Sequence, residues 1–276
     1  CAAVSAGALA QDSTPEESDT RGIGELVELV VTARREAESM MKVPVSVAAL
    51  SEADIERHGV VDLSGIAHLA PQVFVAQAAS GSGASFVIRG IGSSPLDQSI
   101  EQSVSVNLDG VQVSRGRLVT QTMMDLAQVE VLKGPQALFF GKNSPAGVIS
   151  VTSNGPTPYR ETHVRVGYES EARERFIEAV ASGPITDTIG ARLALRASRM
   201  DGWFHNPAKP MANPWAPQYP LPGAQEERQI GKEDFSGRLT LEYSTDGPFS
   251  ASLKLLGSAY EDDSYAAGYQ VVCGPG

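Results

Sequence analysis

Residues 235–243 read Phe-Ser-Gly-Arg-Leu-Thr-Leu-Glu-Tyr, and this stretch indicates most clearly how the chain folds. Phe235, Leu239, Leu241 and Tyr243 share one parity with Gly237, and polar residues fill the positions between them. Because successive side chains of a β-strand point to opposite faces, the stretch predicts a strand with one apolar and one polar face. Strands of a membrane-spanning barrel and of a soluble β-sandwich with one wet face both look like this.

The same alternation recurs on either side, in segments of about ten residues typical of barrel strands. The further segments are residues 162–169, 188–198 and 249–255. Gly183–Asp187 and Thr245–Pro248 are short connections, whereas 201–232 is a long one. Short connections alternating with long ones match the periplasmic turns and extracellular loops of an outer-membrane barrel, with the short link 170–173 as an exception. We therefore favour the start of a barrel, over residues 155–276, instead of the sandwich.

Residues 42–154 predict a different unit, an α+β domain with a small mixed sheet and short helices. Val43–Val47 alternates like a strand, Ser51 has the pattern of a helix N-cap, and Asp62 is suited to cap a second short helix that runs to His68. Further strands are expected at residues 86–88, 104–108, 129–132 and 148–151. The polar segments 76–85 and 92–103 are predicted to be exposed loops suited to recognition.

The N-terminal 41 residues predict export and a flexible tether. Residues 1–10 end in Ala8-Leu-Ala10, which fits the end of a secretory signal cleaved after Ala10. A frayed Ala-rich terminus and a lipid-carrying Cys1 are the alternatives. Residues 11–41 are mostly polar, with one short β-prone run at Glu28–Ala33. That run is a candidate for strand addition to a partner, or equally the first strand of the next domain.

Composition excludes several classes of function. Among 276 residues, 33 acidic side chains outnumber 22 basic ones, and the net charge of −11 argues against nucleic acid as a partner. No apolar run approaches the ~18 residues of a transmembrane helix. The four histidines are scattered without metal-ligand spacing, and the sequence contains no P-loop, dinucleotide fingerprint or nucleophile elbow. We therefore expect neither an enzyme nor a cofactor or metal.

Several motifs in order resemble the start of a TonB-dependent outer-membrane receptor, over residues 28–154 with barrel strands after them. Glu28-Leu-Val-Val-Thr-Ala-Arg34 resembles the TonB box, and Val43-Pro-Val-Ser-Val47 resembles the opening strand of the plug domain. Four more stretches resemble the remaining plug motifs: Phe86-Val-Ile-Arg-Gly-Ile-Gly92, Val106-Asn-Leu-Asp-Gly-Val111, Val129-Glu-Val-Leu-Lys-Gly-Pro-Gln136 and Leu138–Thr152.

The resemblance implies a plug inside a barrel of about 22 strands, of which this chain would supply about the first five. It implies the outer membrane of a Gram-negative bacterium, with membrane lipid, the TonB complex and an extracellular ligand such as a ferric siderophore as partners. A glycan, haem or cobalamin ligand, or a secreted β-rich ligand-binding module, is the alternative.

Three sets of residues are predicted to carry that function. The resemblance makes Glu28, Leu29, Val30, Val31, Thr32 and Ala33 the TonB box. Charges inside a barrel need partners, which suggests plug–barrel contacts at Arg89, Glu130 and Lys133. Ligand contacts are expected on the polar and aromatic loop residues Gln77, Ser82, Gln98, Trp203, Phe204 and Trp215.

Overall fold

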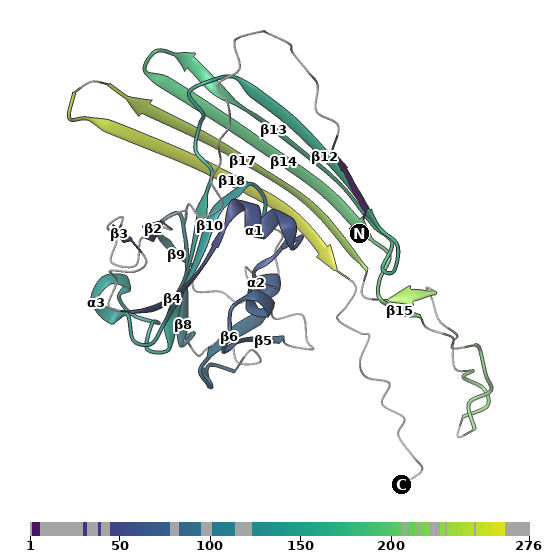
Figure 1. Ribbon diagram of the computed structural model, residues 1–276. Coiled ribbons are helices and arrows are strands. Elements are labelled where there is room, and N and C mark those ends of the chain that lie inside the picture. The colour runs from purple at the N-terminus through teal and green to yellow at the C-terminus, as the bar shows by residue number, and fades with distance from the viewer. Residues whose placement is uncertain are drawn as a thin grey trace, which may run out of the picture. The chain divides into compact units, whose positions relative to one another are not determined.

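The computed structural model describes two compact units, one ending at Asn154 and one beginning at Gly155 (Figure 1). The second unit also includes the N-terminal strand β1 (Ala2–Ser5). The described residues are 2–5, 30–31, 38–39, 45–77, 83–94, 101–113, 123–205, 207, 209–214, 216–220, 223, 227–229, 231–245 and 247–262.

The first unit alternates short strands with three short helices. In chain order its elements are β2 (Val30–Val31), β3 (Glu38–Ser39), β4 (Ser46–Ser51), α1 (Glu52–Arg57), α2 (Leu63–Leu69), β5 (Val73–Gln77), β6 (Ala84–Ile88), β7 (Ile91–Gly92), β8 (Val104–Leu108), β9 (Val111–Val113), β10 (Leu126–Lys133), α3 (Ala137–Phe140) and β11 (Gly147–Ser153). The fold is α+β, as the sequence predicts.

Both predicted helix starts are present. Ser51 caps α1 by accepting a hydrogen bond from the backbone N–H of Asp54, whose carboxylate accepts one from the Ser51 backbone N–H. Asp62 caps α2 by accepting from the Gly65 backbone N–H at 2.8 Å. These side chains satisfy backbone donors that have no partner within the helix, which is why the helices begin there.

The central sheet of this unit is five-stranded and mixed, in the order β4-β10-β11-β8-β9. Only the β11–β8 pair is parallel. One face packs on α1, α2 and the sheet β5-β6-β7 through a core that includes Ile55, Ile66, Phe86, Val129, Val131 and Ile149. The opposite face carries a smaller cluster of Leu132, Phe140 and Val148. A polar residue of this sheet therefore lies either beside the larger core or beside the smaller cluster, depending on the face to which it points.

The second unit is dominated by a six-stranded antiparallel sheet in the order β1-β12-β13-β14-β17-β18. Its long strands are β12 (Glu161–Glu169), β13 (Glu174–Thr186), β14 (Ile189–Met200), β17 (Lys232–Ser244) and β18 (Ser250–Asp262). Figure 1 shows them as one broad, curved sheet. The long connection between β14 and β17 contains a two-stranded ribbon, β15 (Phe204–His205) and β16 (Arg228–Gln229).

Two strand boundaries differ from the sequence-based expectation. Residues 183–186 belong to β13, because Gly183 pairs with Ala191 and Thr186 with Ile189. The register shifts between Pro184 and Thr186, as expected where proline offers no N–H to the ladder. The strand expected at Val43–Val47 overlaps β4, which begins at Ser46, and residues 43 and 44 lie outside the described residues.

The N-terminal predictions stay predictions. Residues 2–5 pair antiparallel with β12, so this segment occupies a sheet edge in the chain as it stands. Cleavage of a signal after Ala10 would take place during export, so it stays a prediction. Within the described residues, none of the helices combines the length and the hydropathy needed to cross a membrane.

Candidate functional site

Arg89 and Lys133, predicted as plug–barrel contacts, come together at one end of the first unit's core. The backbone N–H of Arg89 donates to the Gln72 carbonyl at 3.0 Å, and a Cβ built on Gly134 would lie 4.0 Å from its Nη1. Lys133 is 9% exposed. Burial lowers the pKa of the Lys133 ammonium, and the nearby positive charge of Arg89 lowers it further. Two cations thus share a small region although they lie 44 positions apart.

Glu130, the third residue of that predicted set, lies on the other face of the sheet. Val129 and Val131 point into the larger core, so the alternating side chain of Glu130 points to the face of Leu132. It is 2% exposed and accepts a hydrogen bond from Nε2 of Gln128 at 3.1 Å. The three residues therefore do not form one contact patch.

Glu130 belongs to a row of polar residues that crosses the sheet. The strand registers align it with Ser150 on β11, Asn107 on β8 and Gln112 on β9. Asn107 is also buried, and its side-chain amide makes no hydrogen bond within the described part of the chain. Burying such groups costs free energy compared with an apolar face.

The predicted TonB-box segment lies only partly within the described residues. Val30 and Val31 form β2, which pairs antiparallel with Ser39 and Glu38 of β3. Glu28, Leu29, Thr32 and Ala33 lie outside the described residues. The described pair thus has the extended backbone that strand pairing requires.

In the second unit, one face of the long-stranded sheet carries buried charges. Arg165, Glu178 and Arg196 lie side by side on three strands, and Oε2 of Glu178 is 3.1 Å from Nη2 of Arg165 and 3.3 Å from Nη1 of Arg196. Arg196 is 2% exposed and stacks over the Phe176 ring at 4.3 Å. A second pair joins Arg192 to Glu161 at 2.8 Å. We call this surface the polar face.

The opposite face, the apolar face, carries exposed hydrophobic side chains. Phe235 is 57% exposed, and others on this face are Val164, Val166, Ile177, Leu193, Leu195, Leu253 and Leu255. From Ala251 to Ala259 of β18 this face spans eight residue steps, or about 26 Å along the strand before tilt. With the 35–45° tilt of barrel strands this length gives a height of about 20 Å, most of the roughly 25 Å apolar band of membrane barrels. Burial is thus inverted relative to a water-soluble sandwich, which overturns that alternative.

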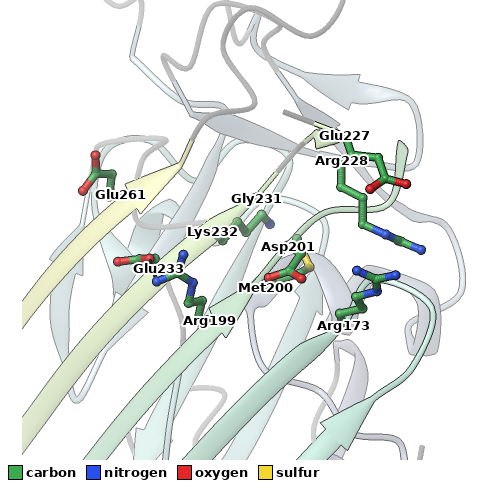
Figure 2. Close-up of a pocket in the computed structure, with 10 residues that line it drawn as sticks. All are labelled: Arg173, Arg199, Met200, Asp201, Glu227, Arg228, Gly231, Lys232, Glu233 and Glu261. Atoms are coloured by element: carbon green, nitrogen blue, oxygen red, sulfur yellow. Dashed lines mark ion pairs between the residues drawn. The ribbon is translucent and has the colours of Figure 1, made fainter. Parts of the chain in front are cut away.

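A pocket of about 430 Å³ lies at the end of this sheet where the long connection leaves it. Figure 2 shows the residues that line it, among them Arg173, Arg199, Asp201, Arg228 and Glu233. Arg228 donates to the carbonyl oxygens of Glu171 and Gly202, which ties the 170–173 turn to the base of the long connection. The pocket is therefore charged and built on strand ends.

The predicted ligand residues are placed only in part. Trp203 and Phe204 are exposed, at the start of the long connection and on β15. Gln77 ends β5, with its side chain outside what the structure describes, as are Ser82, Gln98 and Trp215. The expected loop 76–85 is shorter than predicted, since β5 reaches Gln77 and β6 begins at Ala84.

The sequence analysis did not predict the ion pairs of the polar face or the residues that line the pocket. The arginines of the polar face, Arg165, Arg192 and Arg196, were visible as alternating positions. Glu178, the partner of Arg165 and Arg196, lies on β13, whose pattern was not recognised. The pocket residues come from segments far apart in the chain, so no local sequence pattern predicts that they line one pocket. Among the described residues no group of acidic, histidine or cysteine side chains could hold a metal ion.

Comparisons with known proteins agree with this architecture. Residues 39–148 match the family described as TonB-dependent Receptor Plug Domain. The iron-regulated outer membrane virulence protein of Vibrio cholerae is 23% identical over 71% of this chain and 30% of its own length. The vitamin B12 transporter BtuB of Vibrio vulnificus is 24% identical over 66% of this chain and 29% of its own length.

The fold also matches a solved structure. The ferric yersiniabactin uptake receptor FyuA from Yersinia pestis superposes with a TM-score of 0.67 at 21% identity, over 79% of this chain and 32% of that one. The chain thus spans about a third of the length of the proteins it matches. The BtuB and FyuA relatives are named as a transporter and an uptake receptor, in agreement with the prediction that the chain is not an enzyme. Residues 39–148 therefore form a TonB-dependent receptor plug domain, and the chain has the fold of a receptor plug followed by part of an outer-membrane barrel.

Proposed function

We propose that this receptor takes up a scarce extracellular ligand across the outer membrane, driven by the TonB complex. One observation carries the proposal: a plug domain and a sheet with inverted burial occur in the same chain. The apolar face suits lipid, and the polar face suits the lumen of a barrel that holds a plug. A barrel filled by a plug conducts nothing until the plug is displaced, so transport requires energy.

The TonB box supplies the point of attachment in this proposal. Glu28–Ala33 is added as a strand to the TonB protein, with backbone hydrogen bonds providing the affinity. The extended pair Val30–Val31 supports this role. Arg89 and Lys133, which lie together, and Glu130, on the other face of the plug sheet, supply polar contacts with the barrel wall on two sides of the plug. The plug surface can then separate from the wall without exposing large apolar areas.

The ligand we propose is a ferric siderophore, bound by the loops that carry Gln77, Ser82, Gln98, Trp203, Phe204 and Trp215. Relatives named for iron regulation and for ferric yersiniabactin uptake support this class. Cobalamin is the second candidate, because a vitamin B12 transporter covers a similar share of the chain. Uptake of ⁵⁵Fe-labelled siderophores of several chemical classes should exceed uptake of labelled cyanocobalamin in cells producing the full-length receptor. The reverse order would assign cobalamin.

Substitutions at Val30 test the coupling role. Val30→Ala keeps the backbone N–H and should reduce uptake about twofold at most. Val30→Pro removes that donor and fixes φ, and should abolish energy-dependent uptake. Ligand binding to the cell surface and receptor abundance should match wild type in both variants. Full uptake by the proline variant would show that this strand is only part of the plug or its linker.

A further inference from the structure

The charged residues of the apolar face gather in one row at one end. Within β12, β13, β14, β17 and β18, the apolar-face positions contain four charged side chains, and the strand registers align all four. In order across the sheet they are Arg175, Arg199, Glu233 and Glu261, with Tyr168 of β12 next to Arg175. The neighbouring row is Val166, Ile177, Ala197, Phe235 and Ala259. The row therefore borders the apolar band.

The end of the sheet at which this row lies determines which part of the membrane it faces. The row lies at the end where the long connection leaves β14, together with the short 170–173 turn, whereas the β13–β14 and β17–β18 turns lie at the other end. In outer-membrane barrels the long loops are extracellular, so the row lies where the apolar band meets the headgroups of the outer leaflet. Arginine at such a boundary keeps its stem along apolar surface and its charged group at the level of lipid phosphates.

The two arginines form an arrangement that is unfavourable without an anion. Arg175 and Arg199 are direct cross-strand partners, and like charges directly opposite each other are destabilising. Their acidic neighbours compensate only weakly, since Nη2 of Arg175 is 3.9 Å from Oδ1 of Asp201. Nη1 of Arg199 is 2.8 Å from Oε1 of Glu233, in a pair whose side chains are 60% and 55% exposed. Both guanidinium groups therefore remain accessible to a further ligand.

The adjoining pocket adds room and charge. Arg199 is part of its lining, together with Arg173 of the 170–173 turn and Lys232 at the start of β17 (Figure 2). Within the described residues, neither Arg173 nor Lys232 has a carboxylate within ion-pair distance. Guanidinium groups bind phosphate with two parallel N–H donors, and an ammonium adds a point charge.

We propose that Arg175 and Arg199, with Arg173 of the adjoining turn, bind the phosphate group of an outer-leaflet lipid. The acyl chains of that lipid would lie along the apolar band that begins one row away. This inference rests on the membrane placement of the sheet and does not depend on which ligand is transported. A soluble phosphate would satisfy the cations but would make no use of the adjoining apolar surface.

The test measures binding of lipid A, a phosphorylated outer-leaflet lipid, to detergent-purified full-length receptor by native mass spectrometry. Each cation near a charged surface changes affinity about fivefold, so R175Q/R199Q should bind about 30-fold more weakly than wild type. Glu233→Gln should bind more tightly, because it removes a competing carboxylate. Arg160→Gln is the matched control: it removes an exposed cation before β12, at the short-turn end, and should leave affinity unchanged.

Two further comparisons keep the test decisive. Dephosphorylated lipid A should bind wild type about as weakly as lipid A binds R175Q/R199Q, and inorganic phosphate should bind weakly to both. Affinity within twofold of wild type in R175Q/R199Q would overturn the site, and inorganic phosphate binding as tightly as lipid A would overturn the lipid assignment. If the double variant does not fold, R175K/R199K replaces it, because it keeps the charge, loses the two-pronged donor geometry and should bind at an intermediate level.

Discussion

Side chains alternate between two faces in both large sheets of this chain, but the plug sheet buries its apolar residues whereas the barrel sheet exposes them. In the plug sheet, Val129, Val131 and Ile149 are fully buried and form the core. In the barrel sheet, Ile177, Leu193 and Phe235 are exposed, whereas Glu178, Arg192 and Arg196 are buried. Alternation therefore predicts a two-faced strand in both cases, but which face is buried depends on whether water or lipid is the surrounding medium.

The largest effect is expected from breaking the polar face. Glu178→Leu removes the carboxylate shared by Arg165 and Arg196 and leaves two guanidinium groups without it. Removing one partner of a buried pair costs about 3–5 kcal/mol, because the remaining charge stays desolvated. The free energy of unfolding, from urea titration of the full-length receptor in lipid, should fall by that amount.

The matched control for this change is the exposed pair between Arg199 and Glu233. Glu233→Gln also removes a carboxylate next to an arginine but should cost less than about 1 kcal/mol, since exposed pairs contribute little. Equal losses in the two variants would mean that the polar face is not desolvated in the assembled receptor, and that the comparison between the sheets fails.

A second prediction compares an arginine placed on the lipid-facing side of the barrel sheet with one placed on the exposed surface of the plug. Leu193→Arg places a charge near the middle of the apolar band and should destabilise the barrel by about 2–4 kcal/mol. Phe74→Arg introduces the same side chain at an exposed position of the plug, where it should change stability by less than about 0.5 kcal/mol. The measurement is the urea midpoint of each variant in the full-length receptor. A neutral Leu193→Arg would show that this face contacts water.

The sequence contains the local features of this fold but not its long-range ones. Ser51 and Asp62 mark helix starts because a cap depends on residues within one turn. The strands β14 and β17 were recognisable because their alternation continues for about nine to eleven residues. Four-residue α3 and three-residue β9 were missed, since elements so short have no period to detect.

The candidate site was less predictable because it depends on strand register. The proximity of Arg89 and Lys133 follows from how β6 and β10 pack in one core, which no local pattern specifies. Glu130 was grouped with them on chemistry alone, and strand alternation puts it on the opposite face. The row of Arg175 and Arg199 likewise exists only because β13 and β14 pair in one particular register.

A smaller effect is expected at the first helix of the plug, which has no counterpart in the barrel sheet. Ser51→Ala removes the hydroxyl that accepts the Asp54 backbone N–H and should destabilise α1 by about 1 kcal/mol. Hydrogen exchange of a peptide covering residues 46–62, measured by mass spectrometry in the full-length receptor, should report faster exchange there. Exchange in the barrel strands should be unchanged, because their hydrogen bonds do not involve this cap.

The smallest effect is the pH dependence of the same cap. Hydrogen bonds from the Ser51 hydroxyl and from its backbone N–H lower the pKa of the Asp54 carboxyl below its ordinary value of 3.8. Because the pKa is lower in the folded state, the stabilisation is present above pH 3.8 and is lost as the pH falls through the folded-state value. Exchange of the 46–62 peptide should therefore accelerate as the pH falls below 3.8, and more in wild type than in Asp54→Asn, which has no carboxyl to titrate. Intrinsic exchange rates cancel when the two proteins are compared at each pH. An identical pH profile in Asp54→Asn would mean that the cap's carboxylate does not stabilise the helix.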